Sequence, residues 1–415
     1  MGDTSSLVSH NKGTVRIDSL DLFRGLTILA MIWVNDLAQL RDLPAWLAHA
    51  PASADAMTFP DVVFPAFLFI VGMSIPIALD RRRERGEMLA RTLLHILGRT
   101  AGLLIIGVLM VNVGAINPEA TGLGRSEWAV LMYLGVILTW NAYPDAQGWR
   151  RALFIALRVA GIALLAWLAA IYRGNHGHES TWIRTQWWGI LGLIGWAYLT
   201  ATLCYLLTRG HQAGIAGLAA LGIALCIADK NGTLAQFWLA RTINEYVSLG
   251  GHIGGHSAIV LTGVLAMLIA RPRPIPSDPN VRSGRPVAGL LFMAAILLVA
   301  GIVLRNPYGV SKIRVTPAWC LYCSAICCIV YAGLYWLVDR QGYRAWGGLL
   351  RIAGSNALLA FILPPIVYGL LQILQIDWLS RFNTGAAGFF RSTLLTALMI
   401  ALTAGLTRAY VRLRL

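Results

Sequence analysis

The segment FPDVVFPAFLFIVGMSIPIALDRRRER, residues 59–85, decides the fold class. It contains a mostly apolar run of about twenty residues, which is the length of helix that crosses the hydrocarbon core of a bilayer. The run ends in the basic sequence RRRER at 81–85. Lys and Arg cluster at the cytoplasmic ends of membrane spans. The segment is therefore predicted to be a transmembrane helix whose C-terminal end faces the cytoplasm.

The composition extends this prediction to the whole chain. Of the 415 residues, 57% are hydrophobic and only 13% are charged, and the mean hydropathy is +0.64. Soluble domains carry roughly 25% charged residues. An ordinary soluble enzyme, a disordered protein and a disulfide scaffold are excluded. The net charge of +15 comes in short basic clusters between apolar runs, which favours membrane topology and a lipid partner over nucleic-acid binding.

Apolar runs long enough to span a bilayer recur along the chain. The sequence predicts an all-α, polytopic membrane helix bundle with about twelve transmembrane helices. The candidate spans are 19–38, 60–79, 92–113, 128–143, 152–171, 187–207, 212–229, 256–270, 287–304, 318–338, 349–374 and 390–410.

Basic residues set the orientation of these spans. If the N-terminus is cytoplasmic, 23 of the 34 Lys and Arg residues lie on the cytoplasmic side. Both termini are then cytoplasmic. We expect a cytoplasmic tail at 1–18, one transmembrane domain at 19–410 with a Pro-rich cytoplasmic connector at 271–286, and a cytoplasmic end at 411–415.

Charged and amide side chains within the first span stand out because they are costly in a membrane and usually functional. Asp21 and Arg24 are three residues apart, so they can pair on one helix face. This pair is either structural or part of a site. Asn35 lies among apolar residues at the opposite end of the same span.

The loop that follows, QLRDLPAWLAHAPASADAMTF at 39–59, carries His49. A single loop histidine is normally only solvated, but the apolar residues before it indicate that the loop folds back onto the bundle. Asp61 lies between two prolines at the start of the second span. It suits a helix start, and it could equally orient the imidazole of His49.

Further polar residues lie in two later segments. The non-cytoplasmic loop at 305–319 carries Lys312 against the charge trend, either to hold an anionic or sugar ligand or to face water. Asn356 follows Gly354 and Ser355 inside the eleventh span, which indicates close helix packing or a hydrogen bond to a ligand.

Two motifs hint at metal or redox chemistry. The HIGGH sequence places His252 and His256 four residues apart, a spacing that can bind zinc on a helix. The two glycines favour a loop that caps the eighth span, so we expect no metal. Cys320 and Cys323 form a CxxC inside an apolar segment, where packing between helices is the favoured interpretation.

Four blocks of sequence, in order along the chain, match one family. They are SLDLFRGLTILAMIWVN at 19–35, HA at 49–50 followed by TFPDVVFPAFLFIVGMSI at 58–75, SKIRVTPAWCLYCSA at 311–325 continuing to GLYWLVDRQGYRAW, and GSNALLAF at 354–361. The chain resembles the heparan-alpha-glucosaminide N-acetyltransferase family and its bacterial relatives. That resemblance implies a core of about ten membrane helices, to which the pair of spans at 187–229 is additional.

The resemblance also implies roles for individual residues. In that family the His of the HA motif and the Asn of a VN sequence are catalytic, and His49 and Asn35 occupy those positions. Asp61, Lys312 and Asn356 match recurrent polar residues of the motifs. Where the family has a polar pair after its third core helix, this chain has Met132 and Tyr133.

The chemistry implied by the resemblance is transfer of an acetyl group from cytosolic acetyl-CoA to the amine of an amino sugar. His49, in a loop expected to be periplasmic in a bacterial inner membrane, serves as general base or as an acetyl carrier. Arg24 and Arg99 are expected to contact the CoA phosphates. The alternative is a twelve-helix transporter or flippase for a sugar or lipid-linked saccharide. The acceptor, N- versus O-acetylation, and a homodimer are left open.

Overall fold

The computed structural model describes residues 17–415 apart from 177–178, 272, 276–277, 284–285 and 344–346. The predicted tail at 1–18 thus lies outside the described residues except for its last two. The predicted connector at 271–286 is described in part. There, β3 (Arg273–Ile275) pairs with β4 (Asp278–Ser283) in an antiparallel hairpin.

The helices of the bundle account for most of the described chain. They are α1 (Asp18–Leu37), α2 (Phe59–Glu84), α3 (Leu89–Asn112), α5 (Arg125–Trp140), α6 (Gly148–Ile171), α7 (Gly189–Thr208), α8 (Gln212–Lys230), the π-helix η4 (Leu249–His256) joined to α10 (Ser257–Ala270), α11 (Pro286–Tyr308), α12 (Pro317–Leu334) joined to the π-helix η5 (Tyr335–Arg340), α13 (Gly348–Gly354), α14 (Ala357–Ile373) and α15 (Gly385–Arg408). Shorter elements are η1 (Ala45–Leu47), η2 (Val113–Ala115), α4 (Pro118–Thr121), β1 (Gly174–His176), β2 (Glu179–Thr181), η3 (Leu234–Gln236), α9 (Trp238–Asn244) and η7 (Trp378–Phe382).

This architecture confirms the predicted all-α membrane bundle, and each predicted span coincides with a helix or a joined pair of helices. Among the described residues, nine helices are long and apolar enough to cross a membrane, or ten if the bent pair α13–α14 is one span. Two predicted spans fall outside that test. The first, α1, carries three acidic residues and an arginine, and α5 has only 16 residues. A total of twelve crossings therefore stays a prediction.

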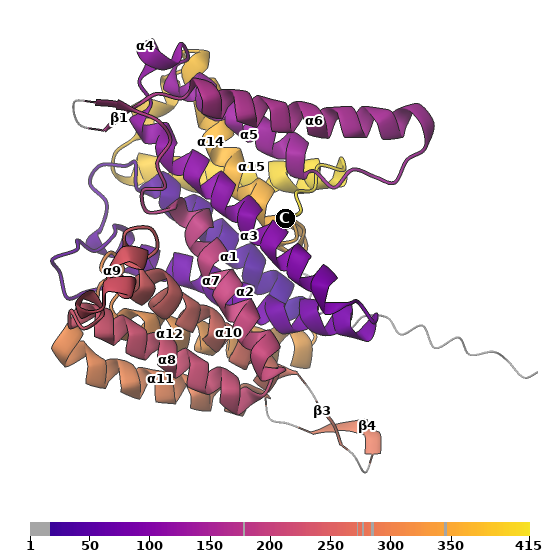
Figure 1. Ribbon diagram of the computed structural model, residues 1–415, viewed down its shortest axis with the longest axis vertical. Helices are drawn as coiled ribbons and strands as arrows, with labels where there is room; N and C mark the ends of the chain where they lie inside the picture. Colours follow the sequence, from indigo (N-terminus) through magenta and orange to yellow (C-terminus); the bar gives the residue numbers. More distant parts are fainter. Residues whose placement is uncertain (1–16, 177–178, 272, 276–277, 284–285, 344–346) are drawn as a thin grey trace, which may run out of the picture.

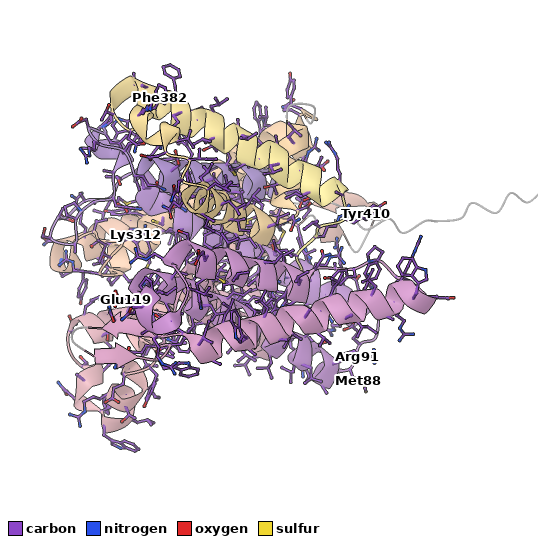
Figure 2. All side chains as sticks on the ribbon, turned by 90° about the horizontal axis from the view of Figure 1, so that it is seen from above. Met88, Arg91, Glu119, Lys312, Phe382 and Tyr410 are labelled. Carbon is purple, nitrogen blue, oxygen red and sulfur yellow. The ribbon has the colours of Figure 1, made fainter. Side chains whose placement is uncertain are left out.

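The connections between helices gather at two opposite ends of the bundle. Figure 1 shows α4, α9 and β1 at one end and the β3–β4 hairpin at the other, and Figure 2 shows Lys312 and Glu119 at the first end and Met88, Arg91 and Tyr410 at the second. We call the first the His49 end. The second contains the RRRER run and is called the basic end.

Contacts between connections bear out this division. At the His49 end, Asp55 binds Arg305, and Arg41 pairs with Thr384. At the basic end, Arg271 binds Asp80. The backbone of Ala142 donates to the carbonyl of Arg412 across 2.7 Å. These contacts place successive connections at alternating ends, as a bundle of membrane-crossing helices requires.

The core of the bundle is the crossing of α2 and α10. A Cβ on Gly72 would lie 1.9 Å from the carbonyl oxygen of Val260, and a Cβ on Gly263 would lie 2.0 Å from that of Phe69. Only glycine permits so close an approach from both helices, which is how small residues associate helices in membranes. The crossing fixes α2, whose first turn carries Asp61.

The HIGGH motif does not form the predicted loop. Residues 249–256 form the π-helix η4, which runs directly into α10. Ser248 accepts a hydrogen bond from the backbone of Gly251 and starts the helix. The glycines serve packing rather than flexibility, because a Cβ on Gly254 would lie 2.7 Å from the carbonyl of Gly222 on α8. The expectation of a loop was wrong because glycine was interpreted as a helix breaker.

A sharp break separates α13 from α14, which meet at 90°. Asn356 lies in this break and is 2% exposed. Its amide donates to the hydroxyl of Thr407 and the carbonyl of Val411, and its carbonyl oxygen accepts from the backbone of Leu413. Asn356 thus holds residues 411–415 against the bundle.

Candidate functional site

The His49 loop folds onto the start of α2, and Asp61 organises it. Asp61 is 1% exposed, and one carboxylate oxygen accepts from the backbone of Ala50 and from the backbone and hydroxyl of Thr58. The single proton of the Thr58 hydroxyl is shared with the carbonyl of Ala48, 2.7 Å away. The helix start that the sequence predicted for Asp61 is therefore also the anchor of the loop.

The second carboxylate oxygen of Asp61 lies 2.7 Å from Nδ1 of His49. An ionised carboxylate only accepts hydrogen bonds, so the Nδ1 facing it carries the proton. In this tautomer the lone pair lies on Nε2. The His49 side chain is 40% exposed while its partner is buried. A carboxylate that fixes the tautomer of an accessible imidazole is the arrangement of general-base and nucleophilic sites.

Lys312 comes from the α11–α12 loop and reaches the same pair. Its Nζ lies 3.3 Å from Nδ1 of His49 and 3.9 Å from the carboxylate of Asp61. Burial lowers the pKa of the Lys312 ammonium, and the Asp61 carboxylate opposes that shift. Trp319 on α12 donates to the backbone carbonyl of Asp61 across 3.2 Å, which ties the cluster to the core.

His49 and Lys312 line one mouth of a cavity of about 620 Å³ that runs toward the basic end. One face of α2 forms a wall of it, and its residues recur about every helical turn: Pro60, Val63, Phe64, Phe67, Ile70, Val71 and Ser74, followed by Arg82. At a helical rise of 1.5 Å per residue, the distance from Pro60 to Arg82 is about 33 Å. The cavity therefore extends along the bundle for about the thickness of a hydrocarbon core.

The other mouth of this cavity is lined by four guanidinium groups and one imidazole. The arginines are Arg24, Arg82, Arg99 and Arg414, and the imidazole belongs to His95. Arg24 bonds Asp21 and Ser74, and Arg82 bonds Glu87. The guanidinium of Arg99 stacks on the ring of Tyr198 at 4.6 Å, and its buried Nε has no hydrogen-bond partner among the described residues. Clustered guanidinium groups of this kind bind phosphate.

Asn35, on α1, is exposed, lines this cavity and also lines a second one of about 400 Å³. The two cavities also share Met31, Ile190 and Phe361. The polar end of α1 therefore lies where two internal spaces meet.

The structure brings most of the predicted site residues together. His49, Asn35, Lys312, Arg24 and Arg99 line the long cavity. Asp61 is hydrogen-bonded to His49, and Asp21 pairs with Arg24.

Asn356 is placed beside this cavity, whose lining includes its neighbours Gly354, Ser355 and Ala357. Both its amide nitrogen and its carbonyl oxygen bond the chain itself. Sequence reasoning missed Arg82, His95 and Arg414 as lining residues. The regular spacing of the α2 face was the signal that could have found the wall, and Arg82 continues that face.

The other candidate clusters differ from this site. His252 and His256 stack at 6.0 Å inside the bundle, and the Nδ1 atoms of both are buried without a partner among the described residues. Within the described chain, no group of three or more His, Cys, Asp or Glu residues could hold a metal. All six cysteines are free thiols, and the four on α12 are buried.

The chain is similar to one protein family and to two known proteins. A family described as "Domain of unknown function (DUF5009)" matches residues 16–243, which is more than half of the chain. The chain is 35% identical over 97 residues to the human heparan-alpha-glucosaminide N-acetyltransferase, covering 23% of this chain and 14% of that protein. It is 34% identical over 146 residues to the mouse protein, covering 32% of this chain and 21% of that protein. The aligned stretch is thus a minor part of both relatives.

Proposed function

The chain belongs to the family described as a domain of unknown function (DUF5009), and from that premise we propose that it is a membrane acetyltransferase. In this proposal it transfers an acetyl group from acetyl-CoA to the amine of an amino sugar. The observation that carries the proposal is one cavity with an Arg-rich mouth and a carboxylate-oriented histidine at the other end. The identity of the acyl group and the class of acceptor are inferred from the names of the human and mouse relatives.

The basic end suits the nucleotide part of acetyl-CoA. Arg24 and Arg99 lie at this mouth, where guanidinium groups can pair with phosphate oxygens. The apolar face of α2 then offers a path for the extended pantetheine arm. A thioester carried by that arm reaches Asn35 and His49 without the charged nucleotide entering the membrane.

At the His49 end, the proposed chemistry is direct transfer. The acceptor amine attacks the thioester carbonyl, the C–S bond breaks, and the CoA thiolate leaves. Nε2 of His49 takes the amine proton and returns it to the thiolate. Asn35 polarises the carbonyl through its amide. In the relay alternative, Nε2 itself attacks the thioester carbonyl, the C–S bond breaks and the CoA thiolate leaves. The amine then attacks the acetyl-imidazole, the C–N bond to His49 breaks, and the amine proton passes through the freed imidazole to the thiolate.

The proposed orientation places the basic end in the cytoplasm and the His49 end in the periplasm of a bacterial inner membrane. The uneven distribution of Lys and Arg supports it. Single-cysteine variants at residues 53 and 85, in a background without the six native cysteines, test it in intact cells. An impermeant thiol reagent is expected to label residue 53 alone, and labelling of residue 85 alone would reverse the orientation.

Acetyl transfer is tested with purified protein in nanodiscs, radiolabelled acetyl-CoA and glucosamine. We expect labelled N-acetylglucosamine and one equivalent of free CoA thiol per turnover. Saccharide movement across proteoliposomes without any acetylated product would instead support the transporter alternative. Acetyl-imidazole trapped by acid quench after mixing with acetyl-CoA alone would replace direct transfer by the relay.

A further inference from the structure

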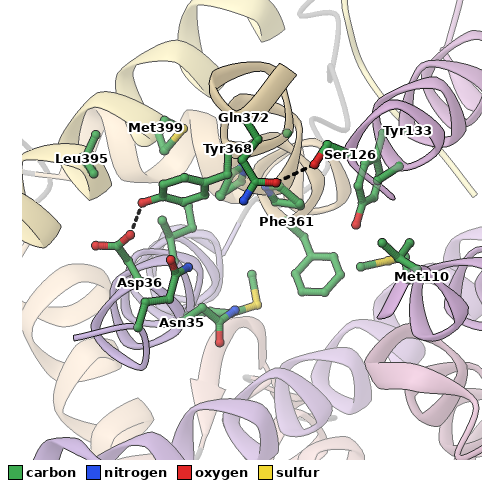
Figure 3. Close-up of a pocket in the computed structure, with 18 of the residues that line it drawn as sticks. Asn35, Asp36, Met110, Ser126, Tyr133, Phe361, Tyr368, Gln372, Leu395 and Met399 are labelled. Carbon is green, nitrogen blue, oxygen red and sulfur yellow. Dashed lines mark hydrogen bonds between the residues drawn. The ribbon is translucent and has the colours of Figure 1, made fainter. Parts of the chain in front are cut away.

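A second cavity, of about 400 Å³, opens within the His49 end beside the long one. Its lining includes Gln39 just beyond α1, Arg125 and Ser126 at the start of α5, and Gln372 in the last turn of α14. These positions all belong to the His49 ends of their helices. Figure 3 shows the cavity between α1, α5, α14 and α15. A ligand would therefore enter it from the end opposite the Arg-rich mouth.

The acidic residue of this second cavity, Asp36, is paired within the protein. One carboxylate oxygen of Asp36 accepts from the hydroxyl of Tyr368, and the other binds Arg391, 3.2 Å away. Asp36 is 4% exposed. An unpaired carboxylate would hold an acceptor amine as ammonium, which cannot attack a thioester. Because both oxygens of Asp36 are engaged, an amine bound here can lose its proton.

The remaining lining suits a ring that has hydroxyl groups and apolar faces. Figure 3 shows the hydroxyl of Tyr133 directed between Phe361 and Met110, and Gln372 bonded to Ser126 at the far side. Sugar rings bind between aromatic faces and amide or hydroxyl groups because they present CH surfaces and polar edges together. Both kinds of group are present here.

Two prolines shape the wall formed by α14. Pro364 and Pro365 line the cavity, and proline has no N–H to donate. In a regular helix those two N–H groups would bond the carbonyls of Ala360 and Phe361. Ala360 is fully buried and outside the lining, so the two prolines add apolar surface to this wall rather than hydrogen-bond acceptors. The volume is near the lower limit of small-molecule sites, about 300 Å³, which selects a monosaccharide-sized ligand.

We propose that this second cavity binds the acceptor saccharide ring and presents its amine at Asn35, where the long cavity delivers the acetyl donor. The inference rests on the proposed acetyl transfer and assigns the donor and the acceptor to different cavities. Asn35 is the polar residue common to both linings. Donor and acceptor then approach from opposite ends of the bundle and never share a path.

The experiment compares Tyr133→Phe and Gln372→Leu with a control, Leu370→Ala, which lies two residues earlier on α14, is 43% exposed and is outside the lining. Loss of a hydrogen bond to a ligand is expected to raise the KM for glucosamine about tenfold in each variant. The KM for acetyl-CoA should stay within about twofold of the parent, and the control should match the parent. An unchanged KM for glucosamine, or an equal rise in the KM for acetyl-CoA, would overturn the assignment.

Binding of glucosamine without acetyl-CoA separates this proposal from the proposed function. Isothermal titration of the parent and of Tyr133→Phe in nanodiscs is the measurement. If Tyr133→Phe weakens glucosamine binding but the parent transfers no acetyl group, the saccharide site is supported and the enzymatic proposal is wrong. If the parent transfers acetyl groups but binds glucosamine with the same affinity as Tyr133→Phe, the proposed enzymatic function stands and the proposed saccharide site is wrong. Absence of glucosamine binding to the parent overturns the site.

Discussion

The two ends of the long cavity differ in the way they use charge. At the His49 end, one buried carboxylate accepts four hydrogen bonds and fixes the orientation of a single imidazole. At the basic end, several cationic side chains share one mouth, and Arg99 keeps a buried Nε without a partner in the described chain. An oriented imidazole suits bond making, whereas a set of cations suits holding an anion. Substitutions at the first end should therefore lower kcat, and those at the second should raise the KM for acetyl-CoA.

The largest expected effect is that of His49→Ala. Loss of the group that moves the proton is expected to lower kcat by about 10⁴-fold, the upper range for general acid–base catalysis. Acetyl transfer to glucosamine by purified protein is the measurement. His252→Asn is the matched control, because His252 belongs to the stacked pair on η4 rather than to the cavity lining. Turnover close to that of the parent in His49→Ala would contradict the assignment of the chemical step to the His49 end.

Asp61→Asn tests whether the carboxylate acts through the imidazole. The amide cannot select the Nδ1–H tautomer, so kcat is expected to fall by about 10³-fold although His49 remains. The pH profile of kcat should change along with its magnitude, which a purely structural loss would not produce. Asp55→Asn is the control at the same end, since Asp55 binds Arg305 and the backbone of Val310 instead. An equal fall in kcat in both variants would show that Asp61 only anchors the loop and does not act through the imidazole.

Arg99→Gln tests the opposite end. A lost charge-assisted hydrogen bond to phosphate is expected to raise the KM for acetyl-CoA by about 10- to 100-fold and to leave kcat within about threefold. Arg158→Gln is a close control, because Arg158 also lies over a tyrosine ring, Tyr143, and is outside the cavity lining. A fall in kcat with an unchanged KM would contradict the assignment of this end to binding.

Much of this difference between the two ends could be predicted from the sequence, because charged residues are rare within membrane-spanning segments. Apolar length predicted the helices, and the rarity of polar groups within them drew attention to Arg24, Asn35 and Asp61. The contact of His49 with Asp61 was offered as one of two interpretations of the carboxylate. The structure shows both together, since Asp61 caps α2 and bonds the imidazole at the same time.

Other features depended on tertiary contacts that spacing does not encode. The HIGGH glycines were interpreted as a loop, yet they pack η4 against α8. Asn356 was expected to support packing or to meet a ligand, and its partners are residues more than fifty positions away at the C-terminal segment. The second cavity draws its lining from six helices, so no local pattern could indicate it. Asp36, which lines it, binds Tyr368 and Arg391, more than 300 positions away in the chain.

The smallest expected effect belongs to Lys312, and it concerns stability with pH. Because burial lowers the pKa of the Lys312 ammonium, the folded protein binds fewer protons than the unfolded chain between that pKa and the ordinary lysine value of 10.5. The stability of the parent therefore rises with pH through this window, relative to a variant without the amine.

Thermal unfolding of the parent and of Lys312→Met in nanodiscs, between about pH 8 and pH 10.5, is the measurement. The difference in Tm, parent minus variant, should increase with pH by about one degree. Lys312→Arg stays charged over the whole window and should show the same increase in the difference. A constant difference would mean that burial and Asp61 cancel, and a difference that decreases with pH would mean that Asp61 stabilises the ammonium more than burial disfavours it. Lys312 would then be a fixed positive charge beside His49, and the His49 end would share the cationic character of the basic end.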